Sequence, residues 1–517
     1  MKETILLTDG YKLGHHRQYP EGTEMVYSNW TPRSCKYFPE AEEGAVVFGL
    51  QYLIKEYLIK QFNENFFNLP REQAVEQFYY RVNNYVGIDS VGLKHIRELH
   101  NLGFLPIEIK ALSEGSICPI RVPWMTIKNT IPEFYWITNY LETLISCSLW
   151  MPSTSATRAR LYKKELMRHA KLTKYPKDVP IDFSCHDFSM RGMAGVEAAI
   201  ISGMAHLTSF SGTDTIPAIG ALEEYYNADA KNELIGSSVP ATEHSVMCAG
   251  GKEDEIGTFK RLINDVYPKG IVSIVSDTWD FWQVIEDFLP KLKKDIMARD
   301  GRVVIRPDSG DPVDIICGLR TNPHYNTKIK DGKYYVCYNP FDDDNFYTEI
   351  SKGQYYGAYW MLGEIFGWNT TENGYQYPDT HIGLIYGDSI TLERQKHIYS
   401  RLESVKCAAC NLVLGVGSYS YQYVSRDSLG YAVKATACIV NGEYRPIFKQ
   451  PKTDDGTKNS LKGLISVYKD SEGKYYAKDE VSFDEEEQGE LKTVFKDGKL
   501  LVDWTLKEIR ERINETL

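Results

Sequence analysis

Cysteine is scarce in this sequence, with ten residues in 517, and they are scattered rather than grouped in pairs. Small secreted domains held together by disulfides are much richer in cysteine, so that class is excluded and a reducing compartment fits. Long apolar runs are also missing. The N-terminal run, Ile5–Leu7, is too short for a signal peptide, and no stretch approaches the ~18 residues of a membrane span. We therefore expect a cytoplasmic protein without a membrane partner.

Positive charge is in the minority, because 59 Lys and Arg stand against 70 Asp and Glu and the formal net charge is −11. A protein that binds a nucleic-acid backbone over a broad surface needs the opposite sign. Nucleic acid is therefore not an expected partner. A phosphate-bearing small molecule would need a local cluster of basic side chains, since the overall field repels it.

Three common nucleotide and metal motifs are absent or incomplete. No G-x-x-x-x-G-K-[ST] occurs, which excludes a P-loop. Gly415 and Gly417 begin a G-x-G-x-x-G, but Ser420 stands at its last position and no acidic partner is evident, which disfavours a Rossmann site. Cys407 and Cys410 form one isolated C-x-x-C without the second ligand pair of a structural zinc site.

The chain is long enough for two packed domains, and its 43% hydrophobic and 25% charged residues are ordinary globular values. Residues 1–150 mix helix patterns with a β-rich stretch and predict an α+β outer domain. From about 181 to 417, short apolar runs alternate with helix-length amphipathic segments, which is typical of parallel βαβ units. A Tyr-, Gly- and Asn-rich segment at 319–380 interrupts this rhythm and indicates a hairpin insertion.

Seven of these apolar runs end in polar groups that carry chemistry. Helix caps alone would explain Ser, Thr and Asp at such positions, but they do not require Arg, His and Phe. Parallel barrels place their active sites at the carboxyl ends of the strands, so we expect one shared active site. The seven groups are HDFSMRG (186–192), SGTDT (211–215), SVPATEHS (238–245), SDTWD (276–280), RPDSGDP (306–312), YGDS (386–389) and GVGSYS (415–420).

The side chains in these groups can bind a polyanion, an aromatic ring, and a divalent cation or sugar hydroxyls. Arg191 and Arg306 can bind a polyanion, and Phe188 can serve as an aromatic platform. His244 follows Glu243 at a predicted helix start, where the alternatives are a functional imidazole and an ordinary hydrogen-bonded structural residue. Carboxylates for a divalent cation or for sugar hydroxyls come from Asp277, Asp280, Asp308 and Asp388.

These motifs, together with LLTDGYKLGHHRQYP, LPIEIKALSEG and the late VFKDGKLL, occur in an order that resembles the nicotinamide phosphoribosyltransferase family nearly end to end. The resemblance implies an α/β fold: an incomplete TIM-like α/β barrel with a second α+β domain, as in type II phosphoribosyltransferases. The outer domain would combine 1–150 with the β-rich 420–517, and 151–419 would form the barrel. The family also implies a homodimer with active sites at the subunit interface.

The implied reaction joins nicotinamide to 5-phosphoribosyl 1-pyrophosphate (PRPP) and gives nicotinamide mononucleotide and pyrophosphate, as in NAD salvage. The pyridine nitrogen has no proton to lose, so the site needs positioning and charge stabilisation rather than a general base. Mg²⁺ would bridge phosphate oxygens, and ATP would be a co-substrate that phosphorylates His244. Glu243 and Asp280 are the candidates to orient that imidazole. A rival role for His244 is pyrophosphate binding alone.

The resemblance also implies the ligand contacts. Phe188 and the partner subunit's Tyr11 would sandwich the pyridine, and Asp214 would accept from the amide and repel the carboxylate of nicotinate. The pyrophosphate would lie on Arg191 and Arg306, and the ribose on Asp308, Gly387 and Asp388. The 5′-phosphate would lie near Gly417 and Ser418, with Arg426 and Lys434 from the partner. Ser418 and Ala432 stand where the family usually has Gly and Ser.

The sequence leaves three alternative functions to compare with this one. Nicotinate phosphoribosyltransferase would need a cation or neutral donor where Asp214 stands. Another alternative is a different barrel enzyme that acts on a phosphosugar, such as an aldolase or an isomerase. None of the seven strand ends carries a lysine, which counts against a Schiff-base aldolase. A catalytically inactive binding protein would not need to retain Phe188, Arg191 and His244 together.

Overall fold

The computed structural model describes residues 3–339, 346–387, 389–448 and 461–517. Within these residues, six parallel strands form one curled sheet in the order β7-β6-β16-β15-β9-β8. Six of the seven predicted strand ends belong to this sheet, whereas the seventh, around 238–245, forms only isolated bridges. The strands are buried toward their carboxyl ends, although the first residues of β8 and β9 are exposed. Their bounds are β6 Cys185–Asp187, β7 Gly212–Thr213, β8 Lys269–Val275, β9 Asp300–Arg306, β15 Ile382–Tyr386 and β16 Leu412–Val416.

A short segment, residues 237–241, joins the two edges of this sheet. Ser237 forms a parallel bridge to Gly212 beside β7, and Ala241 forms one to Ser273 in β8. The sheet therefore curls almost completely round, which confirms the predicted incomplete α/β barrel. The helices of this part are α8 Val196–His206, α9 Ile216–Tyr226, α10 His244–Gly250, α11 Glu255–Arg261, α12 Phe281–Gln283, α13 Leu289–Met297, α14 Pro312–Cys317, α15 Lys352–Tyr356, α16 Ala358–Phe366, α17 Leu392–Ser404 and α18 Ser418–Tyr421.

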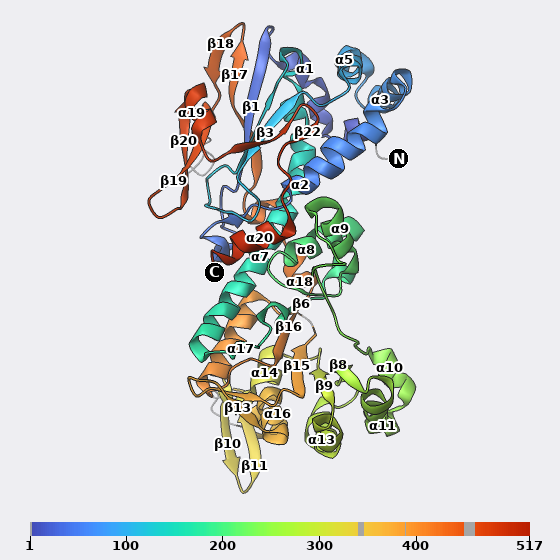
Figure 1. The fold of residues 1–517 in the computed structure, drawn as a ribbon, viewed down its shortest axis with the longest axis vertical. Coiled ribbons are helices and arrows are strands. Elements are labelled where there is room, and N and C mark those ends of the chain that lie inside the picture. The colour runs from blue at the N-terminus through green and yellow to red at the C-terminus, as the bar shows by residue number, and fades with distance from the viewer. Residues whose placement is uncertain (1–2, 340–345, 388, 449–460) are drawn as a thin grey trace.

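An antiparallel sheet of seven strands forms the other end of the molecule, above the barrel in Figure 1. Its order is β18-β17-β1-β5-β3-β21-β22, so a strand from near the C-terminus lies directly beside β1. The strands are β1 Thr23–Thr31, β3 Ile107–Ala111, β5 Met125–Asn129, β17 Ala432–Val440, β18 Glu443–Pro446, β21 Lys492–Lys496 and β22 Lys499–Leu500. The first 130 residues and the last 90 therefore share one sheet.

Smaller elements surround this sheet. The hairpin of β19 Leu464–Lys469 and β20 Tyr475–Val481 packs through Leu464 and Ile465 on Met25 and Tyr27 of β1. A further pair joins β2 Ala45–Val46 to β4 Ile117–Cys118. The helices are α1 His15–Gln18, α2 Leu50–Tyr52, α3 Arg71–Tyr85, α4 Ile88–Val91, α5 Lys94–Leu102, α6 Ile137–Tyr140, α19 Phe483–Gln488 and α20 Leu506–Asn514.

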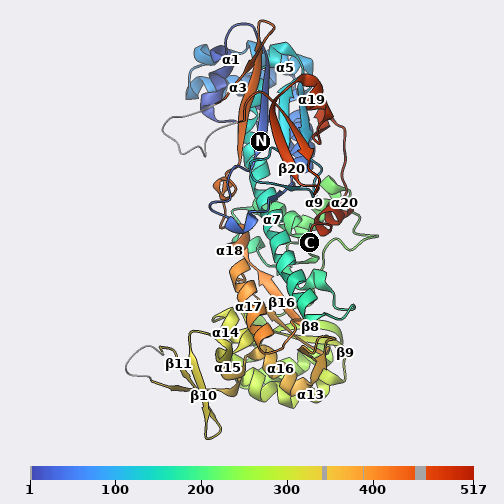
Figure 2. The same ribbon diagram turned by 90° about the vertical axis from the view of Figure 1, so that its left-hand side faces the viewer.

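The helix α7 Glu142–Thr173 connects the two ends and runs along the molecule in both views (Figures 1 and 2). Along its length it packs on β17 of the antiparallel sheet and on α8 and α17 of the barrel. In the part of the chain that the structure describes, neither this 32-residue helix nor any other is long and apolar enough to cross a membrane.

Residues 319–380 contain a three-stranded antiparallel sheet that projects from the barrel (Figure 2). Its first two strands, β10 Asn326–Lys330 and β11 Lys333–Cys337, are joined by Asp331 and Gly332, which both have positive φ. An Asp-Gly pair is the usual choice for such a two-residue turn. The remaining strands are β12 Thr348–Ile350 and the pair β13 Trp368–Thr370 and β14 Gln376–Pro378.

Candidate active site

A cavity of about 980 Å³ opens at the carboxyl ends of the barrel strands. Residues far apart in the sequence meet there because parallel strands end at the same edge of a sheet. The cavity wall comes from the ends of β6, β7, β9, β15 and β16 and from the segment after 237–241. It consists of Phe188, Met190, Arg191, Asp214, Glu243, His244, Ser245, Arg306, Asp308, Gly387 and Ser418.

One end of the cavity pairs an aromatic ring with a carboxylate. The Phe188 ring lies 4.4 Å from that of His186, and a Cβ on Gly415 would come within 2.9 Å of it, so glycine makes room for the ring. Asp214 Oδ1 accepts hydrogen bonds from Ser238 Oγ at 2.6 Å and His186 Nε2 at 2.9 Å. Burial alone would raise the pKa of Asp214, but these hydrogen bonds outweigh it and hold the pKa below its usual value. The carboxylate is therefore ionised at neutral pH.

The basic part of the cavity rests on Arg306. Its Nη2 donates to the carbonyl oxygen of Thr242, whereas its Nε is buried without a hydrogen-bond partner among the described residues. Burial lowers the pKa of Arg306, and the neighbouring Asp308 opposes that effect. A guanidinium stays charged even so, because its ordinary pKa is above 12. With Arg191 on the same wall, the cavity presents a local positive cluster in an acidic protein.

His244, Asp277 and Asp308 form a compact cluster whose ligand atoms lie within 4.8 Å of one another. His244 Nε2 is 3.4 Å from Asp308 Oδ1 and 3.9 Å from Asp277 Oδ1, and Nδ1 is 3.0 Å from Thr278 Oγ1. Burial and then repulsion from Asp277 raise the pKa of Asp308. Two carboxylates this close favour a shared cation.

Asp277 has two different oxygens. Its Oδ2 accepts from the backbone N–H groups of Asp308 and Ser309 and from Ser309 Oγ, at 2.6–2.9 Å. Its Oδ1 is buried and has no hydrogen-bond partner within the described ranges. Asp277 therefore fixes the loop that carries Asp308 through Oδ2, while its Oδ1 faces His244.

His244 does not have the neighbours that the sequence predicted. Asp280 caps α12, because its carboxylate accepts from the N–H groups of Trp282 and Gln283 at 3.0 and 3.1 Å. Glu243 accepts from the hydroxyl of Ser245. The expectation that these two carboxylates orient the imidazole differs from the structure. The physical reason is that free N–H groups of a helix N-terminus bind a nearby Asp.

The sugar and phosphate candidates lie on the same wall. A Cβ on Gly387, the residue after β15, would come within 3.3 Å of the Asp308 Cβ, so glycine gives Asp308 room at this strand end. Gly417 precedes α18, and Ser418 is its first residue, with Oγ close against Gly192. Asp388 lies outside the described residues.

Three predicted residues lie elsewhere on the chain. Tyr11, with 65% of its surface exposed, and Arg426 line a separate hollow of about 250 Å³ together with Cys147 and Trp150. Lys434 belongs to β17 in the antiparallel sheet, opposite Asn29 of β1. None of the three lines the cavity of its own chain.

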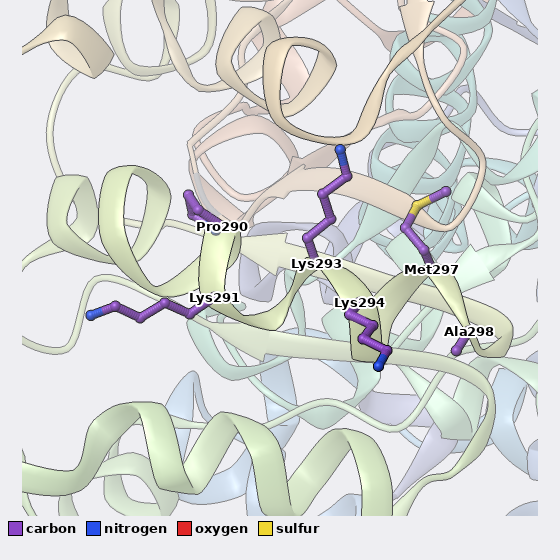
Figure 3. A pocket seen from close by; sticks show the side chains of 6 residues that line it. All are labelled: Pro290, Lys291, Lys293, Lys294, Met297 and Ala298. Atoms are coloured by element: carbon purple, nitrogen blue, oxygen red, sulfur yellow. The ribbon is translucent and has the colours of Figure 1, made fainter.

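A third hollow, of about 530 Å³, lies along α13 (Figure 3). It is lined by Pro290, Lys291, Lys293, Lys294, Met297 and Ala298, all from that helix and its end. No residue predicted for the active site borders it. It is therefore separate from the cavity at the strand ends.

Sequence reasoning missed His186, Ser238 and Thr278, which orient Asp214 and His244. Each lies inside one of the seven polar groups, but only His186 carried a specific signal. His186 and Phe188 are two residues apart, and alternate residues of a strand share a face. Ser238 and Thr278 gave no comparable signal, because small hydroxyl residues are common at strand ends.

Comparisons with known proteins agree with this architecture. Residues 183–499 match the family model described as nicotinate phosphoribosyltransferase (NAPRTase) family, and residues 3–109 match that of the nicotinamide phosphoribosyltransferase N-terminal domain. A nicotinamide phosphoribosyltransferase of Acinetobacter baylyi is 47% identical over 98% of this chain and 96% of its own length. A nicotinamide phosphoribosyltransferase of Mycoplasma pneumoniae is 32% identical over 90% of this chain and 97% of its own length.

Two solved structures share the fold at low identity. A nicotinate-nucleotide pyrophosphorylase from Pyrococcus furiosus has a TM-score of 0.55 at 14% identity and covers 99% of this chain and 95% of its own. Human nicotinic acid phosphoribosyltransferase has a TM-score of 0.52 at 13% identity, with 99% and 93% covered. The resemblance noted in the sequence is thus confirmed, and the chain belongs to the nicotinamide phosphoribosyltransferase family.

Proposed function

We propose that this chain is a pentosyltransferase that moves the phosphoribosyl group of PRPP to nicotinamide and releases pyrophosphate, as a step of NAD biosynthesis by salvage. One observation carries the proposal beyond family membership. The same cavity holds an ionised carboxylate beside an aromatic ring at Asp214 and Phe188, and a cationic pair at Arg191 and Arg306. These two environments suit an uncharged amide-bearing ring and a polyphosphate.

The chemistry needs little from the protein beyond placement. The pyridine nitrogen attacks C1′ of the ribose with its free lone pair, the C1′–O bond breaks, and pyrophosphate leaves with the electron pair. Phe188 holds the ring face, and an aromatic face stabilises the positive charge that develops on the ring. Arg306 Nε is a buried donor without a partner among the described residues, and a phosphate oxygen would satisfy it.

The carboxylates fit a Mg²⁺ that arrives with the substrate phosphates. Asp277 Oδ1 is a buried acceptor without a partner in the described part of the chain, and Asp308 faces the same space. Mg²⁺ prefers carboxylate and phosphate oxygens. The ion would neutralise charge on the leaving pyrophosphate. Asp277 and Asp308 would hold it, and the Ser309 hydroxyl keeps Asp277 in place.

The amide is preferred over the acid because of Asp214. Nicotinate carries a carboxylate that would stand against the ionised Asp214, and its neighbours His186 and Ser238 already donate to Oδ1. Nicotinamide instead offers an N–H₂ donor. Nicotinate phosphoribosyl transfer is therefore the less favoured alternative at this site.

His244 is the group through which we propose coupling to ATP. Thr278 engages Nδ1, and Nε2 faces Asp277 and Asp308 in the cavity. A phosphoryl group could bond to Nε2 while Nδ1 stays held, which is the arrangement a phosphohistidine needs. Thr278 takes the orienting role that the sequence assigned to Glu243 or Asp280.

We propose further that the active enzyme is a homodimer in the cytoplasm. Tyr11, Arg426 and Lys434 lie off the cavity of their own chain, so they could act only in a partner's site. The reducing compartment is supported by the small number and the scattered positions of the ten cysteines.

The test is a reconstituted reaction. Purified protein is supplied with PRPP, Mg²⁺ and nicotinamide, with and without ATP, and mononucleotide and pyrophosphate are quantified. We expect equimolar amounts of both products and a faster rate with ATP. No mononucleotide under any condition would refute the proposed transferase.

A further inference from the structure

A buried carboxylate, Asp187, lies beneath the aromatic and acidic end of the cavity and has no role in the chemistry above. It is the last residue of β6, directly before Phe188, and is fully buried. Its Oδ1 accepts from the backbone N–H of Ser189 at 2.9 Å. Its Oδ2 accepts from the hydroxyls of Thr215 at 2.7 Å and Thr213 at 3.2 Å.

These contacts surround Asp214 on both sides. Thr213 and Thr215 flank it in the sequence, and both donate to the same oxygen of Asp187. The Asp214 backbone N–H donates to the carbonyl oxygen of Asp187 at 2.9 Å. The 213–215 turn therefore wraps around Asp187, and the Asp214 side chain is left to face the cavity. The other carboxylate oxygen fixes the turn after Phe188.

No ion pair to Asp187 is present in the described part of the chain. His206, whose imidazole interacts electrostatically with Asp187, is buried, and burial lowers its pKa to about 4, so the ring is neutral. His206 is engaged by the Tyr421 hydroxyl at 2.7 Å and the Gly212 carbonyl at 3.0 Å. Asp187 is thus held by directional hydrogen bonds alone, which fix geometry more strictly than an ion pair does.

We infer that Asp187, acting through the hydroxyls of Thr213 and Thr215, is a positioning residue that sets the place of Asp214 relative to Phe188 and thereby the preference for the amide substrate. The inference rests on the proposed function. Phe188 and Asp214 follow different strands. His186 contacts both side chains from the cavity side, and Asp187 holds the backbone turns on which they stand. A loose turn would let Asp214 move away from the pyridine amide without disturbing the phosphate end.

The test removes one hydroxyl without changing side-chain shape. Thr215→Val deletes the donor to Asp187, and Thr215→Ser restores it. Thr173→Val is the matched control, because Thr173 is equally buried and its hydroxyl donates to a backbone carbonyl in α7, at 2.8 Å. For each variant, KM and kcat are measured for nicotinamide, nicotinate and PRPP, together with the thermal midpoint.

For Thr215→Val we expect the nicotinamide KM to rise about tenfold, as for loss of a hydrogen bond to a charged group, with the PRPP KM nearly unchanged. The preference for nicotinamide over nicotinate falls with it. Thr215→Ser returns the nicotinamide KM and the preference for nicotinamide toward their wild-type values. Thr173→Val leaves the nicotinamide KM and the preference unchanged.

The inference would be overturned if Thr215→Val raised the KM values of nicotinamide and PRPP equally. It would also be overturned if the nicotinamide KM did not change. A Thr215→Ser enzyme as impaired as Thr215→Val would overturn it too. If Thr215→Val does not fold, Thr213→Val removes the other hydroxyl that donates to Asp187. It is judged by the nicotinamide KM relative to the PRPP KM and by the preference for nicotinamide over nicotinate. An inactive wild-type enzyme would instead refute the proposed function, so the two failures are distinguishable.

Discussion

At the scale of single residues, we propose that the charge of Asp214 sets which pyridine the cavity accepts. Its carboxylate is ionised because His186 and Ser238 donate to it, although burial opposes ionisation. The family resemblance implied that Asp214 separates amide from acid, and the structure places Asp214 in the cavity wall together with Phe188. The sequence did not identify His186 and Ser238, because their hydrogen bonds cross 28 and 24 residues of chain.

Asp214→Asn should loosen the preference for amide over acid. Removing a close charge is worth about 1–3 kcal/mol, or roughly 5- to 150-fold in the ratio of the two kcat/KM values. Steady-state kinetics with each pyridine measure this ratio. Asp229→Asn, an exposed carboxylate on the loop after α9, is the control and should leave the ratio unchanged. An unaltered ratio in Asp214→Asn would show that another group selects the substrate.

His244→Ala should abolish ATP hydrolysis and acid-labile labelling from γ-labelled ATP. It should leave a slower transfer that does not depend on ATP, because Phe188 and Arg306 still position the two substrates. Labelling and mononucleotide formation are measured on the same preparation. A variant that hydrolyses ATP and responds to it normally would rule out the phosphohistidine and leave His244 as a pyrophosphate ligand.

At the scale of helices and strands, the sequence predicts where the parallel strands end. It does not predict which side chains at different strand ends contact one another. Apolar runs followed by polar groups mark each strand locally. The partners of His244 are Thr278 and Asp308, which lie 34 and 64 residues away. Only the curl of the sheet brings them together. Asp280 shows the converse, since an acidic residue at a strand end can belong to the next helix.

Two substitutions at Asp280 separate capping from catalysis. Asp280→Ala should lower the free energy of unfolding by about 1 kcal/mol, because two N–H groups of α12 lose their acceptor. Asp280→Asn retains a cap and should stay near wild-type stability and activity. Denaturant titration and the transferase assay measure both. An Asp280→Asn enzyme that is stable but no longer labelled by ATP would restore Asp280 to a role at His244.

At the scale of the whole molecule, the cavity lacks the side chains that the sequence expected from a second subunit. Tyr11 and Arg426 meet in a hollow of their own, beside the start of α7. The pairing of β17 with β1 could not be predicted from local pattern, because about 400 residues separate the two strands. That pairing places Lys434 and the N-terminal region at the same end of the molecule.

Subunit mixing tests the shared site. Tyr11→Ala and Arg191→Ala should each be inactive alone, since one disables the partner's site and the other its own. After random exchange, half of the dimers are hybrids with one intact site of two, so about a quarter of wild-type activity should return. Exchange is verified by mass on differently tagged chains. Verified hybrids without activity would place both residues in one subunit's own site.

The most direct measurement of the central claim is a competition in one vessel. Wild-type protein, PRPP, Mg²⁺ and ATP are incubated with equal concentrations of nicotinamide and nicotinate, and the two mononucleotides are separated and counted at early times. We predict that nicotinamide mononucleotide dominates and that pyrophosphate appears in equal amount. Formation of nicotinate mononucleotide as the main product would contradict the role of Asp214 and the proposed function together.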